Sequence, residues 1–258
     1  MSQVAPKPHC LTPIPAGVWQ QLSGVLDPEL DESILELGFV ESLRFVTDEL
    51  RVELRLPTTW CSANFAWMMA EDVRRALLAV ESVRNVTVLL SGHFASERIE
   101  AGVNAGTSFR DAFPEEVLGD LDELRLYFLR KGLLKRQEGL LRSLLRTGLS
   151  YTQIAALTVG DLKIAGDVCH VRRDDGSWSS VGPAENASRY LRRRTQLGID
   201  NSSTAALVTD VSGDSIPADG LRQHYITIRT IRVAQEANGS MCCALLDAHR
   251  RRLSSDSR

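Results

Sequence analysis

The sequence predicts an α+β protein, with a small α-β-β-α-β domain followed by a mainly helical second domain that contains a β-hairpin. Apolar and charged residues alternate strictly over residues 50–56, whereas apolar residues recur with helical spacing over residues 62–80 and 121–145. The 258-residue length exceeds one typical domain. Residues 1–119 carry 9 basic and 17 acidic side chains, a balance of −8, and residues 120–258 carry +5. This asymmetry favours two modules.

The first domain opens with a short helix over residues 16–24, because Pro15 suits the first turn of a helix. Two strands then follow, over residues 39–46 and 50–56, around the turn Thr47-Asp48-Glu49. Every second residue of the later strand is apolar, so one of its faces is expected to be buried and the other wet.

A helix is expected to start at Ser62, a plausible N-cap, and to continue to about residue 80. Residues 85–91 then form a third strand, which completes the small α+β domain. The stretch from 96 to 113 is expected to be partly helical and broken by glycine.

The second half opens with the long helix over residues 121–145. The Asp174-Asp175-Gly176 turn predicts a hairpin of residues 168–172 and 178–181. The other helices are expected over residues 151–157, 184–197 and 218–237. The predicted domain organisation is a flexible leader (1–14), a first domain (15–113), a helical second domain (121–249) and a disordered basic tail (250–258).

Hydropathy and cysteine spacing argue against a membrane-spanning, secreted or cysteine-cluster protein. No stretch approaches the roughly 18–20 apolar residues that span a bilayer, and the proline-rich start lacks the apolar core of a secretory signal. The five cysteines form no CxxC pair, so the sequence predicts neither a zinc ribbon nor a self-contained iron–sulfur scaffold. Free thiols in a reducing cytoplasm are the expectation, with no membrane partner.

Three segments of the first half carry a resemblance to a known family. Asp27-Pro28-Glu29 precedes the run 34–40, ILELGFV, and residues 56–61, LPTTWC, lie between a strand and a helix. Residues 93–97, HFASE, follow the last strand. In this order and spacing they resemble the SufT/PaaD-like metal–sulfur cluster assembly domain, whose members carry a DPE loop, an LGxV strand, a threonine-rich turn ending in cysteine and a His-Ala-Ser-Glu segment. Phe94 is an extra residue here.

This resemblance implies an accessory factor, not an enzyme, that assembles iron–sulfur clusters or iron centres and delivers them to client metalloproteins. It implies iron or a transient iron–sulfur cluster as the cofactor. The narrower hypothesis is service to a bacterial multicomponent di-iron monooxygenase, by association with similar two-part chains. Carried onto this sequence, the residues that contact a partner or cluster are Asp27, Glu29, Thr58, Thr59 and Ser96.

Cys61 is the candidate working residue on chemical grounds as well. A cysteine at a helix start faces unpaired N–H groups and the positive end of the helix dipole, and both favour the thiolate that binds metal. One thiolate cannot hold a cluster alone. Further ligands would come from a second subunit, a client, or the nearby Asp27, Glu29, His93 and Glu97, so Cys61, His93 and Glu97 are the candidate metal ligands.

Each of these residues also has a purely structural interpretation. Cys61 could be an inert buried cysteine, and His93 could be bonded to backbone at the end of a strand. Asp27 and Glu29 could serve turn formation, since Asp-Pro starts turns, and Glu97 could be a solvated carboxylate in the first turn of a helix.

The second half weakly resembles the opening of a tyrosine-recombinase catalytic domain. The resemblance rests on residues 144–150 and 154–162, but Ser150 stands where that family has its first catalytic arginine. The hairpin 168–181 has no lysine, and residues 221–225, LRQHY, have the family's residues in the wrong order. Strand cleavage needs those groups, so we expect a degenerate, non-catalytic domain.

Two arginine runs leave alternative functions open. Arg192, Arg193 and Arg194, and the run 250–252, could contact phosphate, which would make the protein a DNA-binding regulator. The charge of +5 is modest, so a solvated face or a docking surface for an acidic partner is preferred, and a non-catalytic adaptor is the other alternative. A homodimer is also a candidate, since small sheets pair across their edges.

Overall fold

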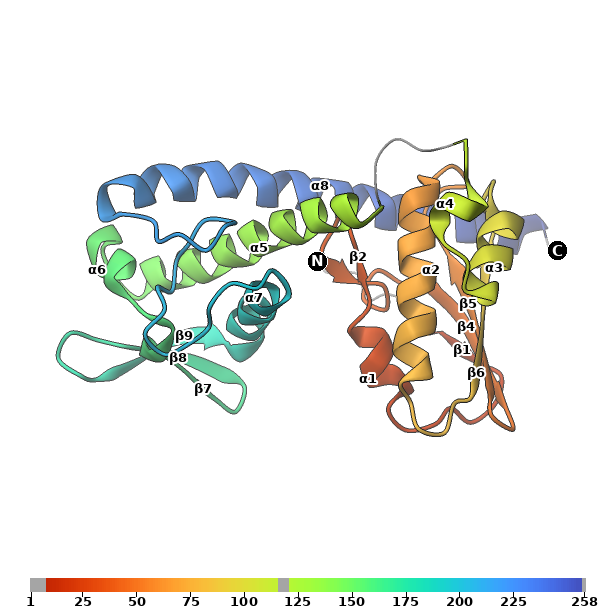
Figure 1. Cartoon of the computed structure of the whole chain (residues 1–258), viewed down its shortest axis with the longest axis horizontal. Coiled ribbons are helices and arrows are strands. Elements are labelled where there is room, and N and C mark those ends of the chain that lie inside the picture. The colour runs from red at the N-terminus through yellow and green to blue at the C-terminus, as the bar shows by residue number, and fades with distance from the viewer. Residues whose placement is uncertain (1–7, 116–120, 257–258) are drawn as a thin grey trace. The chain divides into compact units, whose positions relative to one another are not determined.

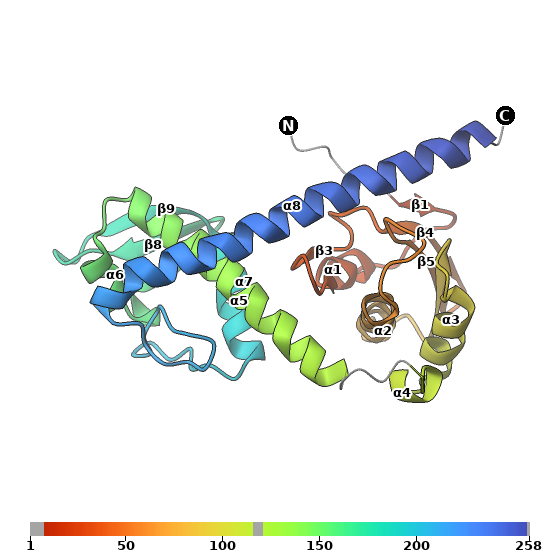
Figure 2. The ribbon, with the colours of Figure 1, turned by 90° about the horizontal axis from the view of Figure 1, so that it is seen from above.

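A computed structural model describes residues 8–115 and 121–256 of the chain, and it confirms the α+β fold class (Figure 1). The chain divides into two compact units. The first contains residues 1–124 together with residues 236–258, and the second contains residues 125–235. The long C-terminal helix α8 (Ala218–Asp256) therefore contributes its first half to one unit and its second half to the other, as one continuous helix (Figure 2).

The first unit is built on a four-stranded sheet in the order β1-β4-β5-β6. Strand β4 pairs antiparallel with β5, whereas β1 on β4 and β6 on β5 are parallel pairs. The elements of this unit, in chain order up to residue 124, are β1 (His9–Cys10), α1 (Val18–Ser23), β2 (Leu26–Asp27), β3 (Glu32–Ser33), β4 (Val40–Val46), β5 (Glu49–Arg55), α2 (Ala63–Leu78), β6 (Asn85–Ser91), α3 (Ser96–Ala105) and α4 (Phe109–Ala112).

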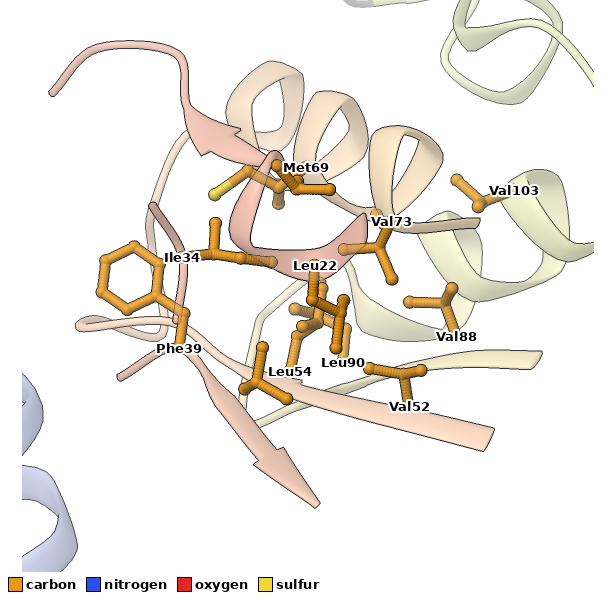
Figure 3. Packing of buried hydrophobic residues seen from close by; sticks show 14 of the residues in the cluster. Leu22, Ile34, Phe39, Val52, Leu54, Met69, Val73, Val88, Leu90 and Val103 are labelled. Atoms are coloured by element: carbon orange, nitrogen blue, oxygen red, sulfur yellow. The ribbon is translucent and has the colours of Figure 1, made fainter. Parts of the chain in front are cut away.

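Helix α2 covers one face of this sheet and forms the main core of the unit. Met69 and Val73 of α2 belong to one buried cluster with Val52 of β5 and Val88 of β6 (Figure 3). All four side chains are at most 1% exposed. Each buried side chain of this size contributes about 1.5–3 kcal/mol, so this face of α2 supplies a large part of the unit's stability. The alternation predicted for residues 50–56 is confirmed, because Val52 and Leu54 point inward between charged neighbours.

The stretch after β6 is partly helical and broken by glycine, as expected, because α3 ends at Gly106, whose φ is 72°, and α4 follows. Another glycine, Gly102, has a different role within α3. Gly102 lies on the face of α3 that meets Trp67 of α2. A Cβ atom at position 102 would lie only 2.5 Å from Cη2 of the Trp67 ring. The glycine is thus a packing residue that lets two helices approach closely, and it does not end the helix.

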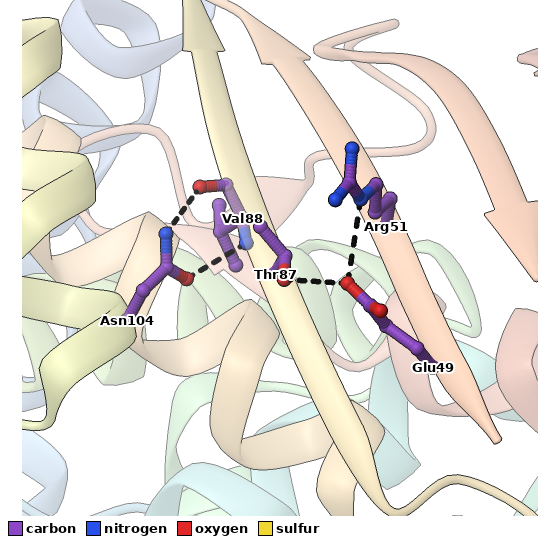
Figure 4. Close-up of polar contacts among 5 residues, drawn as sticks. All are labelled: Glu49, Arg51, Thr87, Val88 and Asn104. Carbon is purple, nitrogen blue, oxygen red and sulfur yellow. Dashed lines mark hydrogen bonds and ion pairs between the residues drawn. The ribbon is translucent and has the colours of Figure 1, made fainter.

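The outer edge of β6 is closed by side chains of α3. The amide of Asn104 accepts a hydrogen bond from the Val88 N–H and donates one to the Val88 carbonyl, both at 2.9 Å (Figure 4). The Glu100 carboxylate accepts from the Leu90 N–H at 2.7 Å. These side chains take the place of a neighbouring strand, so the β6 edge is not open for pairing with another copy.

The face of the sheet opposite α2 is polar. Glu49 accepts hydrogen bonds from Thr87 and Arg51 on this face (Figure 4). Ser42 of β4 and Ser91 of β6 both donate to Glu53 of β5. Cross-strand polar pairs of this kind suit a solvated sheet face and require no ligand.

Both ends of the chain depart from the predicted organisation. Residues 1–7 of the expected leader lie outside the described residues, but His9 and Cys10 form β1 against Ser42 and Leu43. The expected disordered tail is helical as far as Asp256, because α8 continues well past residue 237. Its second half is held on the first unit by Leu246, which is 1% exposed within that unit's core.

The second unit consists of helices around a three-stranded antiparallel sheet in the order β7-β8-β9. The predicted hairpin is present as β8 and β9, and the sequence missed β7, whose short run shows no inward alternation. The elements are α5 (Leu121–Arg146, from Arg125 on), α6 (Tyr151–Ala156), the 3-10 turn η1 (Val159–Asp161), β7 (Leu162–Ala165), β8 (Val168–Arg172), β9 (Trp178–Pro183), α7 (Ala184–Gln196) and the first half of α8.

A buried polar network links the helices of the second unit. Gln137 of α5 donates to the Tyr190 hydroxyl at 3.0 Å and to the Thr209 carbonyl at 2.7 Å. Its side-chain oxygen lies 2.5 Å from Nε2 of His224. Because both ends of the Gln137 amide are satisfied, this polar centre fixes the relative placement of α5, α7 and the start of α8.

The closed β6 edge yields a first prediction. We expect Asn104→Ala to lower the free energy of unfolding by about 1–3 kcal/mol, since it leaves the Val88 N–H and carbonyl without a partner. The open edge should also produce concentration-dependent self-association, measured by light scattering alongside urea unfolding. Asn85→Ala, at an exposed position of the same strand, is the control. Equal behaviour of the two variants would contradict this role for Asn104.

Candidate functional site

Cys61 lies in the turn between β5 and α2, at the end of the sheet where β5 and β6 finish. Ser62 occupies the N-cap position of α2 as predicted, but its hydroxyl makes no capping hydrogen bond. Its carbonyl instead accepts from the N–H groups of Phe65 and Ala66 at 3.1 Å. Cys61 is half-buried and packs against the hydrophobic core, whereas its neighbour Trp60 is 78% exposed.

His93 holds the Cys61 turn in place. Its Nε2 lies 2.8 Å from the Cys61 carbonyl oxygen, and its Nδ1 lies 3.2 Å from the Ala95 nitrogen and accepts that N–H. The ring therefore carries its proton on Nε2 and donates it to Cys61. Burial lowers the pKa of His93, so the imidazole is neutral near pH 7. Since both nitrogens are bonded to backbone, His93 acts here as a positioning residue and not as a metal ligand.

The segment after β6 is joined to the Cys61 turn a second time. The Phe94 N–H donates to the Thr59 carbonyl at 2.8 Å, one residue away from the His93 contact. Phe94 itself is 64% exposed, and its ring lies over the His93 ring at 4.7 Å between centroids. The extra residue of the HFASE segment therefore places an exposed aromatic ring beside the turn that carries Trp60.

Asp27 and Glu29 lie near Cys61, in the turn between β2 and β3. Asp27 is 7% exposed, and its carboxylate accepts from the Leu30 N–H at 2.7 Å, which is the turn chemistry expected of an Asp-Pro sequence. Glu29 accepts from the Asn238 side chain of α8 at 3.3 Å. Both carboxylates are close enough to Cys61 to act on its charge.

The expectation that helix-start placement favours a thiolate at Cys61 is wrong for the metal-free protein. Burial, followed by the negative charge of Asp27 and the neighbouring Cys242, raises the pKa of Cys61 to about 12. A hydrogen bond from the Ser62 backbone opposes this rise but does not reverse it. The thiol form of Cys61 is therefore favoured at neutral pH.

The other predicted residues divide into two groups. Thr58 and Thr59 are half-buried in the Cys61 turn, and the Ser96 N–H donates to the His93 carbonyl at 3.1 Å. Glu97 is exposed on the first turn of α3, as its structural interpretation expects. Within residues 8–115 and 121–256, no three His, Cys, Asp or Glu side chains are grouped so that they could hold a metal ion.

Sequence reasoning missed the contribution of α8 to this site. Asn238 contacts Glu29, Arg250 donates to the Gly38 carbonyl at 2.6 Å, and Cys242 is an electrostatic neighbour of Cys61. The only sequence signal was the spacing of Cys242, Leu246 and Arg250 at intervals of four, one face of a helix. That signal could not have revealed which unit the helix face covers.

The predicted basic patch of the second unit is not a single surface. Arg194 is 1% exposed, and its guanidinium donates to the backbone carbonyls of Ala206, Leu207 and Asp200. Arg193 is half-buried and bonded to Gln196, and Arg192 alone of the three is exposed. The assignment of Arg194 to phosphate contact is therefore wrong, because its side chain fastens the loop after α7.

Comparison with known proteins identifies the class of the first unit. Residues 15–89 match a family model described as "Iron-sulfur cluster assembly protein". This range contains the turn of Asp27 and Glu29, strands β4 and β5, Cys61 and α2. Residues 15–89 are thus similar to iron–sulfur cluster assembly domains. Neither the curated proteins nor the solved structures include a match to the chain. Among the described residues, no helix has the length and apolar character needed to cross a membrane.

The buried His93 predicts a pH dependence of stability. Its pKa is lowered from 6.5 in the folded state, so as the pH falls below about 6.5 the unfolded chain takes up a proton that the folded chain does not. The wild-type free energy of unfolding should therefore decline below this pH. His93→Gln should lack this component, which chemical denaturation at pH 7.5 and 5.5 would measure. The exposed His9→Gln is the control, and identical pH dependence of all three proteins would contradict the prediction.

The buried Arg194 predicts a stability effect without a binding effect. Arg194→Met should destabilise the protein by about 3 kcal/mol, because a buried guanidinium that bonds three backbone carbonyls is lost. Arg192→Met, at the exposed position two residues earlier, should change stability by less than about 0.5 kcal/mol. Thermal and urea unfolding of the full chain would compare them, and equal stability of the two variants would count against a structural role for Arg194.

Proposed function

We propose that this chain is a non-enzymatic accessory factor that assembles iron–sulfur clusters or iron centres and delivers them to client metalloproteins. The observation that carries the proposal is the meeting of separate segments at one end of the sheet. The turn of Asp27 and Glu29, the Cys61 turn and the His93 segment are far apart in sequence. They converge around the Cys61 thiol within the region that matches the family model, or directly beside it.

Within that family, we propose the SufT/PaaD-like branch. The three segments that converge are the ones that carry the resemblance to that branch, namely the DPE loop, the turn ending in Cys61 and the HFASE segment. His93 and the Phe94 backbone bind the Cys61 turn directly, which explains why such a segment would accompany such a turn.

The cargo, iron or a transient cluster, is the substrate in this proposal. Cys61 would bind it by losing its thiol proton to solvent, and the Asp27 carboxylate would offset the positive charge of the arriving metal. His93 fixes the backbone of the turn, and the exposed Trp60 and Phe94 offer apolar contacts to a client beside the thiol. The high thiol pKa suits release, since a client that presents more acidic ligands would compete well.

The client and the role of the second unit are the narrower parts of the proposal. We propose a bacterial multicomponent di-iron monooxygenase as client, in the cytoplasm. The second unit, with its Ser150 capping box and short antiparallel sheet, would be a degenerate recombinase-like module that confers specificity. The buried Arg194 argues against a duplex-binding surface built on residues 192–194.

The function is tested by co-expression with a candidate client monooxygenase. We expect Cys61→Ala to lower the iron content and activity of the purified client by about tenfold or more, since the turn then lacks its only metal-binding side chain. Cys10→Ala, which removes an exposed thiol from the same unit, should leave both unchanged.

Two results would count against the proposal. Unchanged iron loading of every candidate client by Cys61→Ala would rule out a working cysteine at this position. If Cys61→Ser were also silent in vivo while deletion of the gene was not, the adaptor alternative, in which the first unit is only a scaffold, would replace it.

A further inference from the structure

A cavity of about 240 Å³ lies between the second half of α2 and the end of α3, two helices that pack side by side in the first unit (Figures 1 and 2). Cys61 comes just before α2, which begins at Ala63, whereas the cavity is lined by later residues of that helix. Arg74, one of them, lies roughly 16 Å beyond Ala63 along the helix axis, at about 1.5 Å per residue. The cavity is therefore separate from the site at the Cys61 turn.

One side of the cavity is apolar. Val103 of α3 is buried in the hydrophobic core, and Leu78 at the end of α2 is exposed. Gly106, which also lines the cavity, ends α3 with a φ of 72°, and a Cβ atom built there would meet no other atom within 4 Å. The cavity thus has an apolar wall with open space beside it, which suits a short hydrocarbon group.

Arg74 supplies an unsatisfied charge on the polar side of the cavity. Its side chain is half-buried, and its Nε is buried without a hydrogen-bond partner. Within residues 8–115 and 121–256, no hydrogen bond or ion pair involves the Arg74 guanidinium. Because a buried charged donor without an acceptor is costly, this arrangement favours an acceptor that comes from outside the chain.

The other polar groups of the cavity limit the charge of a ligand. Arg75 is exposed and already donates to Asp72 at 2.5 Å, so Arg74 remains the unsatisfied cation. Glu71 also lines the cavity, and its carboxylate disfavours a ligand with two negative charges. The Thr107 hydroxyl donates to a backbone carbonyl of α3 at 3.2 Å. The surroundings therefore favour one negative charge, placed at Arg74.

We propose that this cavity binds a small organic monocarboxylate, whose carboxylate pairs with Arg74 and whose carbon atoms pack on Val103 and Leu78. A planar guanidinium can donate two parallel hydrogen bonds to a carboxylate. The volume lies below the roughly 300–1,000 Å³ of pockets for drug-sized ligands, so the ligand has only a few carbon atoms. Binding makes and breaks no covalent bond, and it does not depend on the metal chemistry proposed for Cys61.

The test uses isobutyrate as the probe, titrated into the full chain at pH 7 and followed by the amide NMR signals. Isobutyrate should shift the signals of residues 71–78 and 103–107. Arg74→Met keeps an unbranched side chain and should weaken isobutyrate binding at least about tenfold. Arg84→Met, at an exposed position of the same unit outside the cavity, is the control and should bind as the wild type does. Equal affinity of Arg74→Met and the wild type would overturn the site, as would the absence of wild-type binding at about 50 mM isobutyrate.

Two further compounds test the class of ligand. Isobutyramide has the same shape as isobutyrate without the charge, and it should bind at least about tenfold more weakly. Inorganic phosphate, largely a dianion above pH 7, should also bind more weakly because of Glu71. Binding of either compound as tight as that of isobutyrate would rule out a monocarboxylate site.

The stability of Arg74→Met separates a binding role from a structural one. Since the substitution removes a partly buried charge that lacks a partner, the unliganded variant should unfold at the same urea concentration as the wild type or at a higher one. Isobutyrate should raise the thermal midpoint of the wild type and of Arg84→Met, but not that of Arg74→Met. Unfolding of Arg74→Met at a lower urea concentration would instead assign Arg74 to the fold and overturn the proposal.

The Cys61→Ala variant shows whether the two sites are separate. It should bind isobutyrate as the wild type does, even where client loading is lost. Loss of isobutyrate binding in Cys61→Ala would contradict a site of its own between α2 and α3.

Discussion

The packing of α2 on β5 and β6 is the constraint on which the first unit depends. Met69 and Val73 on the helix share one buried cluster with Val52 and Val88 on the strands, and this packing fixes where α2 begins. Because α2 must start directly above the end of β5, the short connection between them is drawn into a tight turn. Cys61 is placed by that turn, half-buried at the margin of the core, and its chemistry follows from its depth there.

The fold of the first unit could be predicted from sequence because its information is local. Alternation in β5 and the helical period of α2 are each readable within one segment. Gly102 shows where local information is insufficient, since its role in helix packing depends on Trp67, which is distant in sequence. The assignment of the second half of α8 to the first unit also depends on non-local packing. No pattern within this segment indicates which hydrophobic core Leu246 will join.

The candidate site was predictable in its residues but not in its electrostatics. Sequence order located Cys61, His93 and Asp27, and the structure brings them together. The ionisation state of Cys61 could not be predicted, because burial and the charge of Asp27 outweigh the helix terminus that the sequence makes visible. The burial of Arg194 could not be predicted either, because it depends on carbonyl groups of the loop after α7. Nothing in a run of three consecutive arginines distinguishes Arg194 from the other two.

The sharing of α8 between the two units has a consequence for how the protein is made. A nascent chain emerges from the ribosome N-terminus first, so residues 15–113 can fold well before the segment from Glu236 onward exists. During that interval the turn of Asp27 and Glu29 lacks its contact with Asn238, and the core lacks Leu246. The order of biosynthesis thus leaves the turn of Asp27 and Glu29 without its α8 contact until the later segment is made.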